Sequence, residues 1–162
     1  MDIVRITADD AARFVAMRHA ALVNDAASFR TSAEDDAKVP LAQWEQRLAA
    51  EHVYAVKRSD AWLAIGGLSR ENRAKLDHKG LIWGMYVAPE ARGTGAADQL
   101  MEALVAAGRT LGLRQLQLTL MADNVRAMRL YERHGFATYA TEPASVRFGE
   151  GYADEALMWK LL

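Results

Sequence analysis

The chain has 162 residues, of which 51% are hydrophobic and 25% charged, the composition of an ordinary globular protein of one domain. Lys and Arg number 20 against 21 Asp and Glu, and a net charge of −1 argues against a strong nucleic-acid binder, which is usually basic. The absence of cysteine excludes disulfides, cysteine zinc sites and a thiol nucleophile.

The N-terminal region is too charged for a secretory signal peptide, because acidic and basic residues interrupt every apolar stretch before Val23. No apolar run approaches the roughly 20 residues that a membrane span needs. We therefore expect a soluble, cytoplasmic protein with no nucleic-acid partner and no membrane partner.

The first quarter of the chain predicts one strand and two helices. Asp2–Ile6 alternates in polarity and predicts a short strand, and Ala11–Val23 predicts a helix that Thr7, Asp9 or Asp10 could cap. Residues 24–40 are polar and rich in small side chains, which indicates a connection rather than an interdomain linker. Pro40 suits the start of a second helix, Leu41–Ala50.

The middle of the chain predicts strands. His52–Arg58 and Ala61–Arg70 are separated by only two residues, which predicts a hairpin. Residues 70–80 read as a polar connection. Leu81–Val87 is almost wholly apolar, as expected of a strand that is buried on both faces, and Pro89 ends it.

The last third predicts two helices and three strands. A leucine stripe at helical spacing follows Gly95 as far as Gly112, and clean alternation then predicts a strand over 113–120. The remaining predicted elements are a helix from a cap at Asp123 or Asn124 to Gly135, a strand over Phe136–Phe148 and a strand over Tyr152–Leu161. The predicted order, β-α-α-β-β-β-α-β-α-β-β, implies an α/β (mixed α+β) fold in which helices flank a mixed sheet.

The segment Arg92–Ala97 places two glycines between an apolar strand and a helix. The first N–H groups of a helix have no intrahelical partners and lie at its positive end, so glycines there let a phosphate approach the backbone. A P-loop would have Lys and Ser or Thr after its last glycine, where Ala96 and Ala97 stand. A dinucleotide fingerprint would have Gly or Ala where Asp98 stands. A tight turn without a ligand is the remaining alternative.

A second motif, in "NVRAMRLYERHGF" from Asn124 to Phe136, joins the Arg-x-x-Gly-x-Ala turn. Together, in this order and about thirty residues apart, the two motifs resemble the GCN5-related N-acetyltransferase (GNAT) family. The resemblance lies mainly in Leu81–Phe136, and the predicted element order extends it over nearly the whole chain. It implies one domain over residues 1–162, with a central, mostly antiparallel sheet and about four flanking helices.

The resemblance implies that acetyl-CoA is the co-substrate, with no metal. In that family the turn binds the coenzyme A diphosphate, the preceding strand pairs with the pantetheine arm, and the motif's asparagine meets the same arm. The residues that match these positions are Met85, Tyr86, Val87, Arg92, Gly93, Thr94, Gly95, Ala96, Ala97 and Asn124.

The resemblance also assigns the acid to Tyr131, which matches the tyrosine near the thioester sulfur. An unperturbed tyrosine keeps its proton at neutral pH and can protonate a departing thiolate. A strand N–H near Tyr86 or Val87 would stabilise charge on the carbonyl oxygen. Without cysteine, a cysteinyl relay is impossible and direct transfer is favoured. From helical spacing alone, Tyr131 would read as a core aromatic.

The general base is not evident, because the strand over Leu81–Tyr86 has no carboxylate, although family members often carry a glutamate there. His78 is a candidate, but an exposed histidine in a turn is the better explanation of this residue. In the family, the loop 24–39 and the last hairpin select the acceptor. The residues expected to line its pocket are Phe29, Arg30, Trp83 and Tyr152.

The leading hypothesis is direct N-acetylation of a primary amine on a small molecule, such as an amino acid, a polyamine or an amine-bearing antibiotic. The alternatives are an acetyltransferase that acts on a protein amino group, a non-catalytic acyl-CoA-binding domain and a nucleotide-binding interaction domain. A homodimer is left open.

Overall fold

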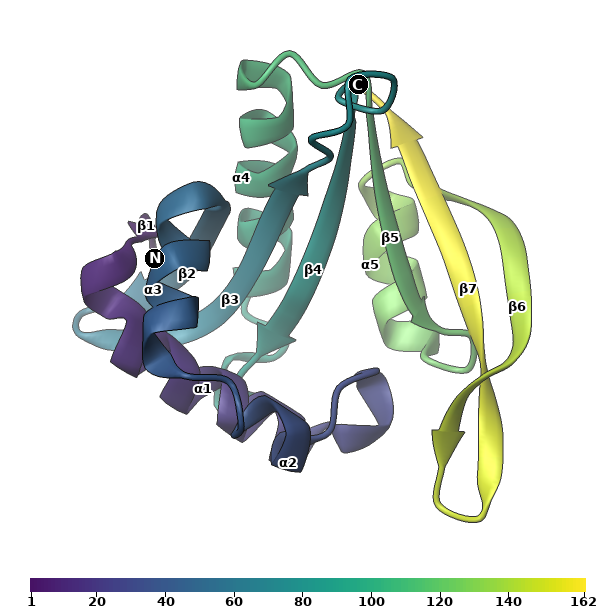
Figure 1. Cartoon of the computed structure of the whole chain (residues 1–162), viewed down its shortest axis with the longest axis horizontal. Helices are drawn as coiled ribbons and strands as arrows, with labels where there is room; N and C mark the ends of the chain where they lie inside the picture. Colours follow the sequence, from purple (N-terminus) through teal and green to yellow (C-terminus); the bar gives the residue numbers. More distant parts are fainter.

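The computed structural model describes residues 1–162 and contains one seven-stranded sheet with the strand order β1-β2-β3-β4-β5-β7-β6 (Figure 1). The strands are β1 (Asp2–Ile6), β2 (His52–Arg58), β3 (Ala61–Arg70), β4 (Lys79–Val87), β5 (Gln115–Met121), β6 (Ala137–Phe148) and β7 (Gly151–Leu161). The helices are α1 (Ala11–Asn24), α2 (Ala33–Asp36), α3 (Leu41–Ala50), α4 (Ala96–Thr110) and α5 (Val125–Arg133).

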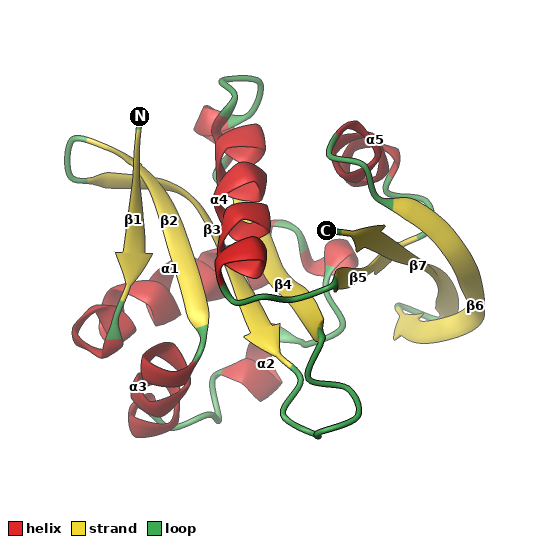
Figure 2. Cartoon of the chain, turned by 90° about the horizontal axis from the view of Figure 1, so that it is seen from above, coloured by secondary structure: helices red, strands yellow, loops and turns green.

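Helices cover the sheet unequally. In Figure 2, α4 and α5 lie on one face, and α1, α2 and α3 lie on the other face over the half of the sheet that contains β1 to β4. Helix α4 contributes the largest buried stripe, in which Leu100, Met101 and Leu104 are fully inaccessible to solvent. This stripe has the i, i+4 spacing that the sequence predicted, because only one side of α4 contacts the sheet.

The sheet is antiparallel except at its centre. The pair β4 and β5 is parallel, and its register covers only Lys79–Leu81 against Gln115–Gln117. Beyond Leu81 the two strands diverge, as the V-shaped opening between them in Figure 1 shows. The N–H and C=O groups on this edge of β4 are therefore left without a strand partner from Ile82 to Val87.

A β-bulge bends β4 within this opening. Ile65 pairs with Tyr86 and Gly67 pairs with Trp83, so two residues of β4, Gly84 and Met85, lie opposite one residue of β3. Gly84 has φ of +64°, a conformation that side chains other than glycine rarely adopt. The bulge turns the end of β4 toward the start of α4.

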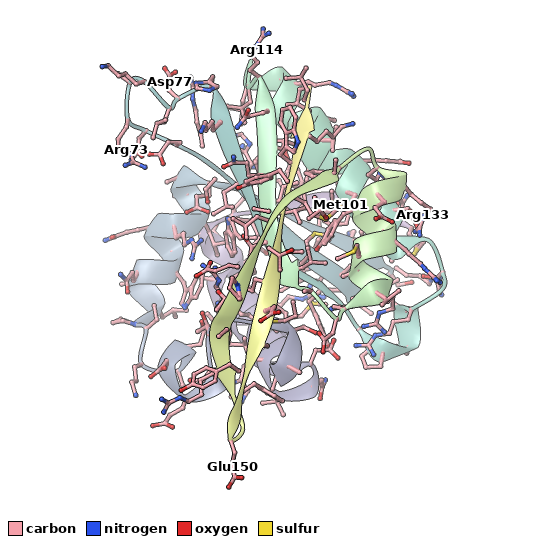
Figure 3. All side chains as sticks on the ribbon, turned by 90° about the vertical axis from the view of Figure 1, so that its right-hand side faces the viewer. Arg73, Asp77, Met101, Arg114, Arg133 and Glu150 are labelled. Atoms are coloured by element: carbon pink, nitrogen blue, oxygen red, sulfur yellow. The ribbon has the colours of Figure 1, made fainter.

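The last hairpin, β6 and β7, extends beyond the helical layers. Figure 3 shows it projecting from the body with Glu150 at its tip. Strand β6 forms the sheet edge, and most of its residues are exposed. Aromatic side chains near the tip are accordingly solvent-exposed, with Tyr152 at 64%.

The observed architecture confirms the predicted fold class and the predicted order of the main elements. Seven elements, namely β1, α1, α3, β2, β3, β6 and β7, lie within one residue of the predicted bounds at both ends. The one-turn helix α2 was not predicted, because its sequence, AEDD, has no apolar periodicity. None of the helices is both long enough and apolar enough to cross a membrane.

Close contact between strands predicts a stability effect at Gly67. A Cβ on Gly67 would lie 2.4 Å from the ring of Trp83, its cross-strand partner, so Gly67→Ala should lower the free energy of unfolding by about 1–3 kcal/mol. Gly151→Ala is the matched control, because its Cβ would meet nothing nearer than 4.0 Å. Denaturant unfolding of both variants checks this. Equal stability of Gly67→Ala and the wild type would contradict it.

Candidate functional site

The turn before α4 is open to a ligand. Gly93 and Gly95 have φ of +76° and +87°, which explains why glycine stands at both positions. A Cβ on either would meet no protein atom within 4 Å, so the space above them is not filled by the chain's own side chains. A tight turn without a ligand would explain the φ angles of Gly93 and Gly95. It would not explain why the space next to both glycines is left open.

The same turn presents a group of unpaired donors. Helix α4 makes its first backbone bond at Gln99 N–H to the Gly95 carbonyl, and its N-cap has no side chain to satisfy the earlier N–H groups. No backbone bond uses the N–H groups of Gly93, Gly95, Ala96, Ala97 and Asp98. These groups and the positive end of the helix dipole make the turn an anion site.

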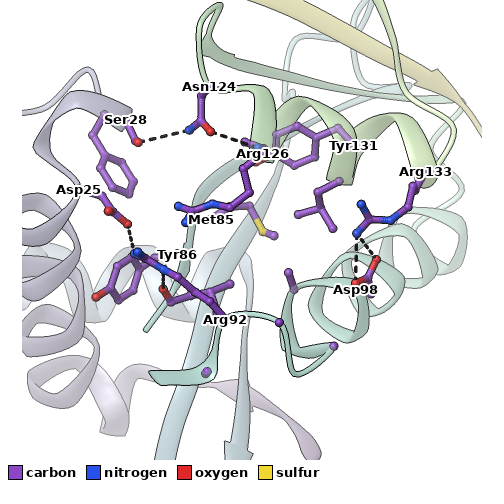
Figure 4. Close-up of a pocket in the computed structure, with 18 residues that line it drawn as sticks. Asp25, Ser28, Met85, Tyr86, Arg92, Asp98, Asn124, Arg126, Tyr131 and Arg133 are labelled. Carbon is purple, nitrogen blue, oxygen red and sulfur yellow. Dashed lines mark hydrogen bonds and ion pairs between the residues drawn. The ribbon is translucent and has the colours of Figure 1, made fainter. Parts of the chain in front are cut away.

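Arg92 contributes to this turn differently from the sequence-based expectation. Its Nη2 donates to Asp25 Oδ2 at 2.6 Å, and its Nε donates to the Val87 carbonyl at 3.3 Å. The guanidinium is therefore held by the end of α1 and the end of β4 (Figure 4). Thr94 likewise uses its hydroxyl within the loop, donating to the Ala91 carbonyl at 2.6 Å.

A free cation reaches the pocket from α5 instead. Arg126 is exposed, lines the pocket and extends across it in Figure 4. Arg133, on the same helix, is already paired with Asp98 at 3.0 Å. Arg126 was not among the residues predicted from the sequence, although a cation two residues after the motif's asparagine could have indicated it.

A short segment from Asn24 to Arg30, which includes the 3-10 turn Ala26–Ser28, crosses the opening between β4 and β5. We call it the crossing segment. Three of its side chains each contact a different part of the pocket. Asn24 donates to the Tyr86 hydroxyl at 3.2 Å, Asp25 pairs with Arg92, and Ser28 accepts from Asn124 Nδ2 at 3.3 Å.

Asn124 combines two roles. Its Oδ1 accepts from the Ala127 N–H at 3.1 Å, so it caps α5, while its Nδ2 donates to Ser28 on the crossing segment. The helix cap that the sequence offered as the alternative is thus present, and the same side chain also lines the pocket.

Tyr131 lies inside the pocket wall with 7% of its surface exposed, and its ring contacts Phe136 edge-on at 6.1 Å between centroids. Burial raises the pKa of Tyr131 to about 12, because a phenolate is poorly solvated there. The side chain is therefore protonated at neutral pH and can donate a proton.

One cavity of about 270 Å³ brings most of the expected coenzyme residues together. Thr94 and Ala96 do not line it: Thr94 is exposed beside it, and Ala96 is buried beneath it, where only its backbone N–H can contribute. The expected residues that line it are Phe29, Met85, Tyr86, Val87, Arg92, Gly93, Gly95, Ala97, Asn124 and Tyr131.

Arg30, predicted to line the acceptor pocket, forms an ion pair across the opening. Its Nε lies 2.8 Å from both carboxylate oxygens of Glu155 on β7, and Ser145 also donates to this carboxylate. Glu155 is 1% exposed. Although burial pushes the pKa of Glu155 upward, the hydrogen bonds from Arg30 and Ser145 outweigh it and hold the pKa below its usual range. The pair fixes the crossing segment to β7.

The other expected acceptor residues are scattered. Trp83 lies on the sheet face that α1 and α3 cover, packed against Phe14 and Trp44 and under the guanidinium of Arg47. Tyr152 lies at the exposed hairpin tip and does not line the cavity. His78 immediately precedes β4, at the end of the strand opposite Tyr86, and so is remote from the cavity.

Comparison with known proteins gives a family match over most of the chain. The acetyltransferase (GNAT) family model matches residues 19–136. A mycothiol acetyltransferase from Geodermatophilus obscurus is 38% identical over 63 residues, 39% of this chain and 20% of that protein, so the match spans about a fifth of the curated relative.

Two solved structures share the fold. An acetyltransferase of the GNAT family from Streptococcus pneumoniae has a TM-score of 0.89 at 22% identity, with 99% of each chain covered. The yncA protein from Salmonella typhimurium, solved with its cofactor acetyl-CoA, has a TM-score of 0.84 at 21% identity, with 100% of this chain and 94% of that chain covered.

The open turn predicts a binding effect at Gly95. Gly95→Glu places a carboxylate among the unpaired N–H groups, so affinity for coenzyme A should fall about tenfold or more. Gly112→Glu is the matched control, because Gly112 also has positive φ and open space but lies at the other end of α4. Calorimetry with both folded variants measures the difference. Wild-type affinity in Gly95→Glu would show that the turn holds no phosphate.

Proposed function

Because the chain belongs to the GNAT acetyltransferase family, we propose that it transfers an acetyl group from acetyl-CoA directly to a primary amine of a small molecule. The observation that carries the proposal is the turn of unpaired N–H groups opening into the same cavity as Tyr131. We also propose that residues 1–162 act as one such domain, since all seven strands belong to one sheet.

The residues present fit coenzyme A. Its diphosphate would be held by the N–H groups of the turn and by Arg126, the cation without a protein partner. Its pantetheine arm would pair with the free edge of β4 from Met85 to Val87, as an added strand does. The Arg92 guanidinium, already bonded to Asp25, would hold the turn in place.

Acetyl-CoA supplies an activated acetyl thioester, and the chain supplies donors on either side of it. Alternate N–H groups of β4 face the opening and can stabilise negative charge on the acetyl oxygen. The Tyr131 hydroxyl can deliver its proton to the departing sulfur, and the proton that the attacking nitrogen releases would restore the neutral Tyr131, directly or through water. Its high pKa makes it a weak acid, but the same buried surroundings raise the proton affinity of a thiolate. The cysteine-free sequence leaves no thiol for a cysteinyl relay, which favours direct transfer.

A release assay tests the proposed activity. Free coenzyme A should appear when the protein is incubated with acetyl-CoA and a panel of small primary amines, and it should not appear with the matching tertiary amines, which cannot form an amide. Tight acetyl-CoA binding without turnover on any amine would favour a non-catalytic binding domain. Turnover on peptides alone would favour a protein amino group as the acceptor.

Loss of the acid should act on the rate rather than on binding. Tyr131→Phe keeps the ring and its contact with Phe136, so acetyl-CoA affinity should change little, while kcat should fall about 10²–10⁴-fold. Because burial raises the pKa of Tyr131 to about 12, wild-type kcat should show no alkaline loss from this group at pH values well below 12. An unchanged kcat in Tyr131→Phe would remove it as the acid.

A further inference from the structure

One arginine lies over β4 on the sheet face opposite α4 and α5. The Nη1 atom of Arg18, on α1, is 3.5 Å from the position that a Cβ on Gly84 would occupy. Gly84 belongs to the bulge and precedes Met85 and Tyr86, which line the cavity. Arg18 is thus close to the strand segment along which the acetyl group would lie, on the sheet face that α1 covers.

Arg18 is held rigidly by its surroundings. Its Nε donates to both carboxylate oxygens of Asp36, at 2.9 and 3.1 Å, and its Nη2 lies 2.8 Å from the same carboxylate. Its guanidinium also stacks on Trp44 at 4.9 Å from the ring centroid. Asp36 is 6% exposed, so this ion pair is fixed within the protein and directs Nη1 toward β4.

The Nη1 donors of Arg18 remain available. A guanidinium has five N–H donors, and those on Nε and Nη2 are directed at Asp36, while Nη1 has no hydrogen-bond partner in the protein. The side chain keeps 11% of its surface exposed, so a small ligand can reach it. A planar guanidinium in such a position is suited to a carboxylate.

The acidic groups, in contrast, are already used. The only two buried carboxylates are Asp36 and Glu155, and each is paired with an arginine. A diamine acceptor would need an unpaired carboxylate to bind its second ammonium group, and neither buried carboxylate is unpaired. The available charge beside β4 is therefore cationic.

We infer that Arg18 binds a carboxylate of the acceptor, and that the acceptor is an α-amino acid; this inference rests on the proposed function. Gly84 and Tyr86 are two residues apart, so their Cα atoms are separated by at most about 7 Å. The attacking nitrogen must approach the acetyl carbon to about 3–3.5 Å. A carboxylate on Arg18 then leaves only a few ångströms between the acceptor's acid and its amine, which is the spacing within an α-amino acid.

Arg18 would also assist the formation of the nucleophile. In a free amino acid the neighbouring carboxylate stabilises the ammonium form, which cannot attack. A guanidinium that pairs with this carboxylate offsets its charge and lowers the pKa of the adjacent amine. This effect would favour the neutral form of the acceptor's amine beside β4, which has no carboxylate that could act as the base.

Matched acceptors test the inference. At saturating acetyl-CoA, kcat/KM is measured for L-amino acids and for their carboxamides, which keep the amine and side chain but lack the negative charge. The wild type should prefer the acids by about 10- to 100-fold, the size of a charge-assisted hydrogen-bond pair. Arg18→Lys should lose most of this preference, because a lysine lacks the planar donor fork.

A double variant separates recognition from folding. Arg18→Met with Asp36→Leu removes both members of the buried pair, so no uncompensated charge remains. It should abolish the preference while keeping turnover of the carboxamides. Arg13→Met is the control on the same helix, since Arg13 stacks on Trp62 in a comparable way but does not contact β4 near the bulge. It should keep the preference.

Three outcomes contradict the inference in distinguishable ways. Equal kcat/KM for acids and carboxamides in the wild type, or an equal loss for both in the variants, would reduce Arg18 to a structural residue while leaving the acetyltransferase intact. Activity on monoamines or polyamines in preference to amino acids would exclude the acceptor class. Absence of turnover with acids, carboxamides and simple amines alike would contradict the proposed function itself.

Discussion

The site depends on the early parting of β4 and β5. Their parallel pairing covers three residues of each strand, and beyond it one edge of β4 has neither a ladder partner nor a covering helix. Backbone groups that a central strand would normally use in the sheet are left to bind something else. The free edge of β4 follows from this opening, and the turn before α4 and Tyr131 on α5 lie beside the same cavity.

Side chains replace the missing ladder as the link between the two halves of the sheet. The crossing segment contacts β4 through Tyr86, the turn before α4 through Arg92, α5 through Asn124 and β7 through Glu155. Each contact contributes about 0.5–3 kcal/mol in favourable cases, with the charged pairs at the upper end. The opening is therefore bridged by a few strong polar contacts, which leaves room for a ligand that continuous backbone pairing would exclude.

Local patterns in the sequence were sufficient to predict the main helices and strands and the glycine turn before α4. Alternation in Gln115–Met121 and the leucine stripe of α4 each bury one side of their element, so their periodicity reports structure directly. Gly93 and Gly95 were readable because positive φ and an open turn both require glycine.

The sequence could not show which side chains far apart in the chain pair with each other. Asp25 and Arg92 are 67 residues apart, and nothing local to Arg92 indicates that its guanidinium pairs with Asp25. Glu155 and Arg30 are 125 residues apart, and an acid in an alternating strand looks like a solvated residue until its neighbours are known. Asp36 ends the acidic run Glu34–Asp36, a pattern that by itself indicates a solvated surface, whereas in the structure Glu34 and Asp35 are exposed and Asp36 is buried.

The crossing segment connects the cavity to the last hairpin. Asp25 and Ser28 line the cavity from one side, while Arg30, only two residues after Ser28, pairs with Glu155 on β7 outside the cavity lining. A ligand that displaced Asp25 or Ser28 would therefore also act on the Arg30 ion pair, and thermodynamic linkage requires the same coupling in the other direction. A substitution in β7 that weakens this pair would accordingly change the affinity of the cavity for its ligand, although no residue of β7 lines the cavity.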